Sequence, residues 1–299
     1  MTAPIVIFCY NRLYHLQQTL DALAKNELAA QSVLYVYSDG PRKGQEVAVA
    51  NVRQFLKTIK GFKSVNIIER PQNFGLGKSV IDGVSSMVSK YGRVIVLEDD
   101  LVSSPYFLRY MNDGIARYEN NEQVASIVGY SYPIEHDQIC YFLNNSDCLG
   151  WATWTKSWQN FQENGQILLD LIVAQKATKH FNFDNQYNYL AMLKNQIAGK
   201  NNSWAVRWYA SNYILNKLTL FPSKSLIQHI GNDGSGTNFV FKSDFLNVNL
   251  ADKAVNIPLD LKVEEDILAR KKVGLYLAGS RSWKRRLSYW LQARFRYSK

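Results

Sequence analysis

Three consecutive carboxylates, Glu98, Asp99 and Asp100, follow the apolar run of residues 94–97. Like charges repel, by about 4 kcal/mol for two unit charges ~4 Å apart at an effective dielectric near 20. A cation or a group of hydrogen-bond donors must therefore compensate such a cluster at the tip of a buried strand. Mg²⁺ and Mn²⁺ bind one or two carboxylates together with substrate phosphates. The triplet thus predicts a metal-bridged diphosphate site, and an exposed acidic turn is the alternative.

The elements that must position the triplet alternate in type along the first hundred residues. Short apolar runs of strand type are separated by segments with apolar residues at helical spacing. The predicted strands are residues 5–10, 33–37, 64–69 and 94–97, and the predicted helices are residues 13–23, 47–59 and 79–90. This alternation predicts an α/β fold of Rossmann-like type, with a mostly parallel central sheet flanked by helices.

Polar residues follow each predicted strand, as a ligand site at the carboxyl edge of a parallel sheet requires. Arg12 follows the first strand, Asp39 the second and Asn73 the third, and the acidic triplet follows the fourth. Lys78 comes directly after a glycine-containing loop at the start of a helix, where it could reach a phosphate. The alternative for Lys78 is an ordinary surface lysine.

Several of these segments resemble a known family. Residues 4–12, 37–40, 73–76 and 96–101 are similar to the nucleotide-binding half of inverting GT-A glycosyltransferases. The resemblance is strongest to bacterial relatives of N-acetylglucosaminyltransferase I and to the family 2 glycosyltransferases. Residues 150–154, Gly-Trp-Ala-Thr-Trp, resemble the segment that follows in the same group. The resemblance covers residues 3–110 closely and extends more loosely to about residue 240.

The resemblance implies a nucleotide-sugar donor and a Mn²⁺ or Mg²⁺ cofactor. It implies that Asp100 is the direct metal ligand and that His229 is a further one. The donor-binding residues that it implies are Arg12 at the nucleotide end, Asp39 on the base, most readily uracil, Glu98 and Asp99 at the sugar and ribose, and Asn73 with Lys78 nearby.

The residue that accepts the proton of the acceptor hydroxyl is less well marked. Relatives place an aspartate in the segment that matches residues 203–208, where this chain has Ala205 and Val206. Asp233, in the glycine-rich loop of residues 231–236, is the first substitute, and Asp184 is the second. Each could instead belong to an ordinary turn.

Aromatic residues and one arginine are predicted to shape the acceptor pocket. Flat rings beside hydrogen-bonding groups suit sugar ligands, although core packing is an equal alternative for the tryptophans. The predicted set is Trp151, Trp154, Trp204 and Arg207.

The basic charge of the chain is concentrated at its C-terminal end. Residues 268–299 contain ten Lys and Arg and no Asp or Glu, and the remaining 25 basic residues equal the 25 acidic ones. Residues 283–295 fit an amphipathic helix, which predicts contact with an anionic membrane surface. A C-terminal helix docked on the protein is the alternative.

Three scattered cysteines and the lack of a leader or an apolar span predict a cytoplasmic protein, peripheral on the inner face of the membrane.

These observations predict a catalytic domain over residues 1–240, with a nucleotide-sugar-binding half (1–110) and an acceptor half (111–240). A connecting segment (241–267) and a basic amphipathic tail (268–299) follow. The predicted reaction is metal-assisted, inverting transfer of a sugar from a UDP-sugar to a hydroxyl of a glycan or a lipid-linked saccharide.

Two alternatives remain open. A nucleotidyltransferase would carry a basic, glycine-rich loop after the first strand, where this chain has Cys-Tyr-Asn-Arg at residues 9–12. A nucleic-acid-binding protein could act through the basic tail, but the neutral body disfavours it and no nucleic-acid partner is expected.

Overall fold

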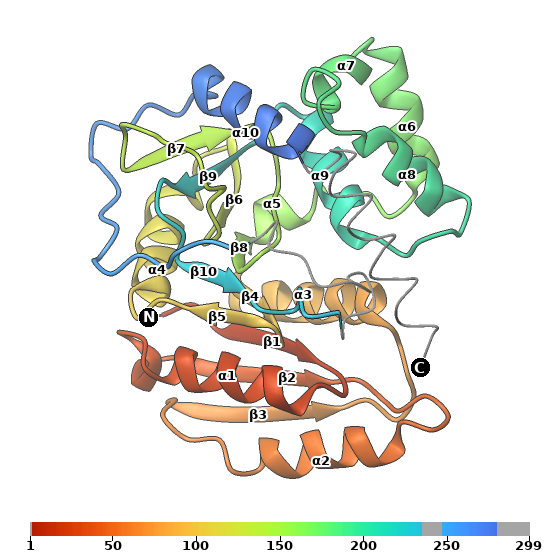
Figure 1. Ribbon diagram of the computed structural model, residues 1–299, viewed down its shortest axis with the longest axis vertical. Coiled ribbons are helices and arrows are strands. Elements are labelled where there is room, and N and C mark those ends of the chain that lie inside the picture. The colour runs from red at the N-terminus through yellow and green to blue at the C-terminus, as the bar shows by residue number, and fades with distance from the viewer. Residues whose placement is uncertain (1, 235–246, 280–299) are drawn as a thin grey trace.

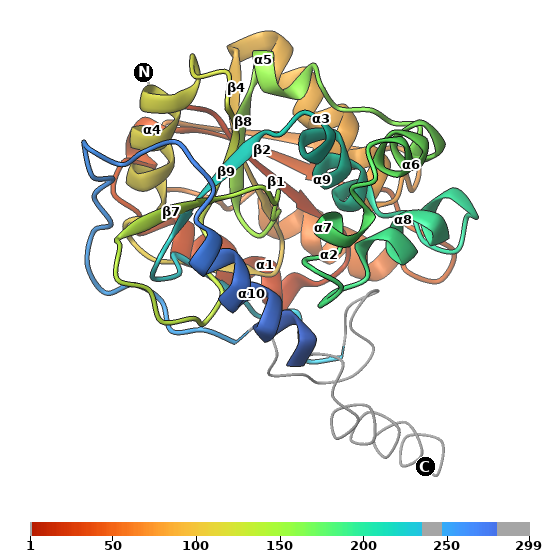
Figure 2. The ribbon, with the colours of Figure 1, turned by 90° about the horizontal axis from the view of Figure 1, so that it is seen from above.

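A computed structural model describes residues 2–234 and 247–279. Its centre is a sheet of eight strands in the order β3-β2-β1-β4-β8-β6-β9-β7, with helices on both sides (Figures 1 and 2). Strands β5 (Leu101–Ser103) and β10 (Ile227–His229) form a separate antiparallel pair. The predicted α/β class with a mostly parallel central sheet flanked by helices is confirmed.

The N-terminal half alternates strands and helices as the sequence predicts. Strands β1, β2, β3 and β4 are parallel to one another. The strands are β1 (Ile5–Cys9), β2 (Val33–Ser38), β3 (Ser64–Glu69) and β4 (Arg93–Glu98), and the helices are α1 (Leu13–Ala24), α2 (Glu46–Leu56) and α3 (Leu76–Tyr91), with a short 3-10 helix at Ala29–Gln31. Helix α3 packs closely on β1, because a Cβ atom at Gly83 would lie 2.7 Å from the ring of Phe8.

The second half departs from this alternation. Strand β8 is inserted between β4 and β6 and is antiparallel to both, whereas β9 is parallel to β6. The strands are β6 (Val124–Val128), β7 (Cys140–Leu143), β8 (Trp151–Trp154) and β9 (Leu218–Pro222). The helices are α4 (Phe107–Tyr118), α5 (Thr155–Trp158), α6 (Gly165–Ala174), α7 (Thr178–Phe181), α8 (Tyr189–Ile197) and α9 (Trp204–Ile214).

The described part of the predicted connecting segment is tied to the body. Arg117 of α4 donates to the carbonyl oxygens of Pro258 (2.5 Å) and Leu259 (2.6 Å). The backbone N–H of Ala251 donates to the carbonyl of Ser225 at 2.7 Å. These bonds bring residues 251–259 against the sheet domain.

Helix α10 (Ile267–Gly279) contains the first part of the predicted basic tail, and it packs on β7. Its buried residues include Arg270, Val273 and Leu277. The docked-helix alternative therefore holds for the described part of this segment. Residues 280–299, with the predicted amphipathic helix, lie outside the described residues. In the described range, no helix combines the length and the apolar character needed to cross a membrane.

Candidate functional site

The candidate site lies where parallel strands end. In the register of the sheet, Phe8 of β1 pairs with Glu98 of β4, and Cys9 pairs with Ser38 of β2. The loops that follow these strands therefore meet at one edge. They carry Arg12, Asp39 and the carboxylates that follow Glu98.

Arg12 pairs with two carboxylates of the cluster. Its Nη2 donates to Asp99 Oδ1 and, at 2.7 Å, to Asp100 Oδ2. The two aspartate side chains are 7% exposed and the arginine side chain 20%. Asp100 Oδ1 is buried and has no hydrogen-bond partner among the described atoms. The arrangement thus leaves one buried carboxylate oxygen available for a further cation.

His229 reaches the same cluster through a long-range strand pairing. Strand β5 begins directly after Asp100, and its first residue, Leu101, pairs with His229 of β10. His229 Nε2 lies 3.4 Å from Asp100 Oδ2, and Nδ1 lies 2.9 Å from the side-chain oxygen of Asn232. Gly231 is required beside this pair, because a Cβ atom there would overlap the Asp100 carboxylate.

Burial and charge separate the acidities of the three carboxyls. Burial raises the pKa of Glu98 to about 8, and the charges of Asp100 and Asp99 add to this effect. Burial also raises the pKa of Asp99 to about 6, although Arg12 opposes it. For Asp100, burial is outweighed by the hydrogen bond and charge of His229 and by Arg12, so its pKa is about 2. Asp100 is therefore ionised at neutral pH, as a metal ligand must be.

The residues present would supply part of the coordination shell of a divalent cation. Among the described residues, three or more His, Cys, Asp or Glu nowhere come together as a metal-binding group. Asp100 offers an ionised carboxylate with an unpartnered oxygen, and a neutral His229 ring would add a nitrogen ligand. Mg²⁺ and Mn²⁺ are commonly held by one or two side chains, with substrate phosphates and water completing the shell.

Asp39 is saturated by backbone and side-chain donors. Its Oδ1 accepts from the N–H groups of Gly40 (2.9 Å) and Phe74 (2.8 Å). Its Oδ2 accepts from the N–H of Gly75 (2.9 Å) and from Asn73 Nδ2 (3.1 Å). A carboxylate has about four lone-pair sites, so this set leaves little capacity for a base. Asp39 and Asn73 bind each other here, and their contact with a nucleotide stays a prediction.

The sequence matches the family model described as "Glycosyl transferase family 2" over residues 5–167, more than half of the chain. The chain belongs to glycosyltransferase family 2. The matched range contains Arg12, Asp39 and the acidic triplet, whereas His229 lies beyond it.

Solved structures with similar folds share little sequence with this family 2 member. TarS 1–349 of S. aureus gives a TM-score of 0.43 at 10% identity, over 76% of this chain and 60% of that one. Its complex with UDP gives 0.32 at 14% identity, over 46% and 39%. A mannosyltransferase of Pyrobaculum calidifontis, in complex with GDP-Man and Mn²⁺, gives 0.36 at 9% identity, over 72% and 70%. The chain thus spans less than two thirds of the TarS fragment, and no protein of curated function matches it.

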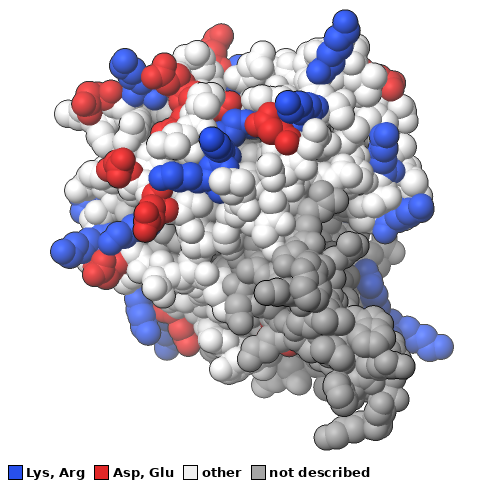
Figure 3. Space-filling model, turned by 45° about the horizontal axis from the view of Figure 1, so that its top comes forward, with Lys and Arg blue, Asp and Glu red and all other residues white. Residues whose placement is uncertain are grey.

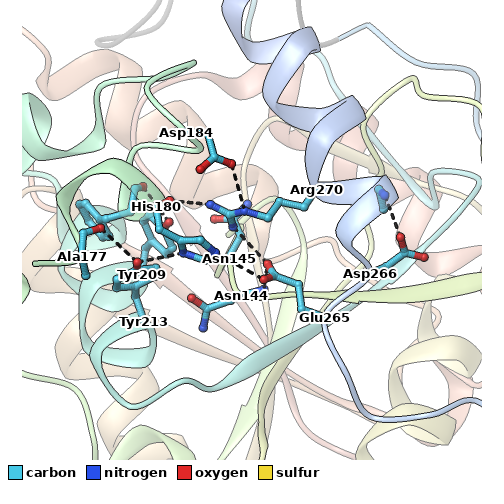
Figure 4. A network of polar contacts seen from close by, with 12 residues as sticks. Asn144, Asn145, Ala177, His180, Asp184, Tyr209, Tyr213, Glu265, Asp266 and Arg270 are labelled. Atoms are coloured by element: carbon cyan, nitrogen blue, oxygen red, sulfur yellow. Dashed lines mark hydrogen bonds and ion pairs between the residues drawn. The ribbon is translucent and has the colours of Figure 1, made fainter. Parts of the chain in front are cut away.

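The structure separates the two predicted proton acceptors of the family 2 chain. Asp233 Oδ2 lies 3.1 Å from Nε2 of His15 in helix α1, on the side of the site that carries Arg12. Asp184 points toward Arg270, whose Nε lies 3.8 Å from Asp184 Oδ2 (Figure 4). Asp184 thus belongs to a cluster held by Arg270 and Glu265, apart from the contacts made by Asp100.

The predicted acceptor-pocket tryptophans are packed in the core. The Trp151 ring lies 5.4 Å from the Trp204 ring and 5.7 Å from the Trp208 ring, centroid to centroid. Trp151 is 1% exposed, Trp154 2% and Trp204 4%. Arg207 Nη1 donates to the carbonyl of Glu163 at 3.0 Å. Core packing, the alternative reading, accounts for these residues, and contact with an acceptor stays a prediction.

Lys78 stays close to the loop that Asp39 holds. It is exposed in the first turn of α3, and its Nζ lies 4.5 Å from the centroid of the Phe74 ring. This position is compatible with the predicted contact to a phosphate and equally with a surface lysine.

One carboxylate at the site, Asp147, is missing from the sequence-based predictions. It lies in the loop before β8, and its Oδ2 accepts from the Tyr132 hydroxyl at 2.8 Å. The sequence contained a signal for it: the polar residues 144–147 follow an apolar strand, as the other predicted site residues do. What the sequence did not reveal is the antiparallel pairing of β8 with β4, which turns this loop toward Glu98.

Proposed function

We propose that the chain catalyses metal-assisted, inverting transfer of a sugar from a nucleoside diphosphate sugar to a hydroxyl of a glycan or a lipid-linked saccharide. A UDP-sugar is the proposed donor. The observation that carries the proposal is the pairing of His229 with an ionised Asp100 whose second oxygen is buried and unpartnered, in a family 2 chain.

Each residue of the site has its own role in binding the donor. Asp100 and His229 would hold Mn²⁺ or Mg²⁺, which supplies positive charge to a departing diphosphate. Arg12 adds a second positive charge beside the same carboxylates. Glu98, at the end of β4 beside Asp99 and Asp100, would contact the sugar of the donor.

The experiment is a thermal-shift screen of UDP-sugars with and without Mn²⁺. A ligand at ~100 times its Kd stabilises the native state by about 2.7 kcal/mol. For a domain of this size, that corresponds to a rise in Tm of about 5–10 °C. We expect the shift with at least one UDP-sugar, only in the presence of metal, and its loss in Asp100→Asn.

The matched control is Asp113→Asn, which removes a carboxylate that is 54% exposed on α4. It should keep the shift of the unaltered protein. A shift of equal size without metal, or in Asp100→Asn, would contradict the proposed role of the cation.

We also propose that the basic C-terminal segment brings the enzyme to an anionic membrane. The basic residues of the body are balanced by acidic ones. On the face shown in Figure 3, basic and acidic side chains are interspersed over the described residues. Truncation after Gly279 keeps helix α10 and removes seven of the ten basic residues of the segment. We expect it to abolish binding to vesicles with acidic lipids and to leave UDP binding unchanged, and vesicle binding that persists would refute this role.

A further inference from the structure

The loop of residues 144–149 lies at the same sheet edge as the acidic triplet. Strand β8 is antiparallel to β4, with Trp151 paired to Val96. The residues before Trp151 therefore extend past the carboxyl end of β4. The loop is fixed there by two backbone bonds, from the N–H of Gly129 to the carbonyl of Gly150 (2.6 Å) and from the N–H of Tyr130 to the carbonyl of Leu149 (3.3 Å).

Asp147 is oriented within this loop by the Tyr132 hydroxyl and by backbone N–H groups. Its Oδ2 accepts from Tyr132 Oη at 2.8 Å, and its Oδ1 accepts from the N–H of Leu149 at 3.0 Å. These bonds fix both oxygens and leave further lone pairs on each. Asp147 itself is half-buried.

The loop is held at its base by a polar network (Figure 4). The N–H of Asn144 donates to Glu265 Oε1 at 3.0 Å, and the Asn144 amide donates to the carbonyl of Lys217 at 2.7 Å. Glu265 is in turn paired with the buried Arg270 at 3.1 Å. Asn145 donates to the Tyr132 hydroxyl at 3.4 Å. A base for proton transfer has to be held in place by such contacts.

The other two carboxylates are less suited to the same task. Asp233 is 48% exposed and paired with His15, and Asp184 is 55% exposed and paired with Arg270. Asp147 has neutral donors as its hydrogen-bond partners. Arg270 carries a permanent positive charge, so Asp184 is a weaker proton acceptor than a carboxylate held by neutral donors. Asp233 is less suited because of its exposure.

Building on the proposed sugar transfer, we propose that Asp147 is the base that takes the proton of the acceptor hydroxyl. The hydroxyl oxygen forms its bond to the anomeric carbon, and its proton passes to a carboxylate oxygen of Asp147. The bond between the anomeric carbon and the diphosphate oxygen breaks, and its electron pair leaves with the diphosphate. Tyr132 is the positioning residue that holds the carboxylate.

The electrostatic surroundings agree with this role. Burial raises the pKa of Asp147, and the hydrogen bond from Tyr132, the N–H groups of Leu149 and Cys148, and the charge of His229 oppose the rise. Burial raises the pKa of Cys148 well above the usual value, and the charges of Asp147 and Glu98 add to the rise, so Cys148 stays a neutral thiol. Tyr189 and Tyr130 near Tyr132 likewise stay neutral, because burial raises the pKa of each.

The first test is Asp147→Asn, which keeps the shape of the side chain and one acceptor oxygen. Release of UDP is measured from the UDP-sugar that binds best, with p-nitrophenyl glycosides or water as acceptor. General-base catalysis contributes about 10²–10⁴-fold, so kcat should fall by at least ~100-fold while the Kd of the donor changes less than about threefold. Asp113→Asn, exposed on α4, is the matched control and should retain kcat.

The second test separates a base from a structural residue. Tyr132→Phe keeps the carboxylate but removes a hydrogen bond that lowers the pKa of Asp147. The pKa of Asp147 should therefore rise, and the acid limb of the pH profile of kcat/KM should move to higher pH. A purely structural role would lower the rate without moving this limb.

The outcomes distinguish the two proposals. If the unaltered protein binds no nucleotide sugar with Mn²⁺, the proposed function fails and the base assignment fails with it. If the protein turns over donor but Asp147→Asn retains kcat within threefold, or only Asp233→Asn loses it, the base assignment alone is overturned. An acid limb unmoved in Tyr132→Phe would also overturn it.

Discussion

Replacing Arg12 by methionine is the sharpest stability test of the carboxylate cluster. The change removes the positive charge that Asp99 and Asp100 share, and both aspartates are only 7% exposed. Removing one partner of a buried ion pair typically costs about 3–5 kcal/mol, because a buried charge is left uncompensated. The arginine is itself 20% exposed, which places the expected loss near the lower end, about 3 kcal/mol.

For a domain of this length, that loss corresponds to a fall in Tm of about 6–12 °C. The assay is a melting curve by circular dichroism without divalent metal. The matched control is Arg109→Met, whose side chain is 45% exposed and pairs with Glu27 and Asp113 at 3.5 and 3.8 Å. Exposed pairs contribute about 0–1 kcal/mol, so this control should melt within about 3 °C of the unaltered protein.

Added Mn²⁺ tests the role of the Arg12 charge in a second way. When Arg12 is absent, Mn²⁺ becomes the available counter-charge for the two aspartates, so it should raise the Tm of Arg12→Met more than that of the unaltered protein. Equal Tm values for Arg12→Met and Arg109→Met would contradict this role of Arg12. So would an equal rise in Tm with Mn²⁺ for Arg12→Met and the unaltered protein.

Three further substitutions address other parts of the site and core. Gly231→Ala should weaken Mn²⁺-dependent UDP binding at least ~10-fold in a calorimetric titration, since its Cβ would displace the Asp100 carboxylate; binding within twofold would contradict this. Asp39→Ala strands three backbone N–H groups and the Asn73 amide, and should cost about 3 kcal/mol in urea unfolding. An unchanged urea midpoint would show that these hydrogen bonds do not stabilise the fold. Trp151→Ala should cost about 3–5 kcal/mol, as for a buried aromatic side chain, and a folded variant of full stability with altered acceptor KM would restore the acceptor-pocket role.

The sequence predicts the N-terminal half well because its pattern is local. Strand β3 is found at the predicted residues 64–69, and β1 differs from the prediction by one residue. Some helix boundaries differ from the prediction. Helix α3 begins at Leu76 rather than at residue 79, and the N–H of Ser79 already donates to the carbonyl of Gly75 at 3.0 Å.

The second half could not be placed from local pattern. The position of β8 depends on its antiparallel pairing with β4, between residues more than fifty positions apart, and no periodicity encodes that pairing. That pairing brings Asp147 to the site edge. The predicted metal ligand His229 depends likewise on the pairing of β10 with β5.

The charge count of the C-terminal segment includes a basic residue that is buried in the fold. Arg270 is among the ten basic residues, yet it is 4% exposed and paired with Glu265. Composition alone cannot show that a basic residue has a buried acidic partner. Asp184 also contacts Arg270 and lies apart from the predicted metal ligands.

The central claim is that a divalent cation held by Asp100 and His229 binds the donor diphosphate. The most direct test is calorimetric titration of UDP into the unaltered protein and into Asp100→Asn, each with Mn²⁺ and with EDTA. We expect Mn²⁺ to lower the Kd of UDP at least ~10-fold in the unaltered protein, a difference of about 1.4 kcal/mol, and to have no effect in the variant. Equal UDP affinity in all four titrations would contradict the account.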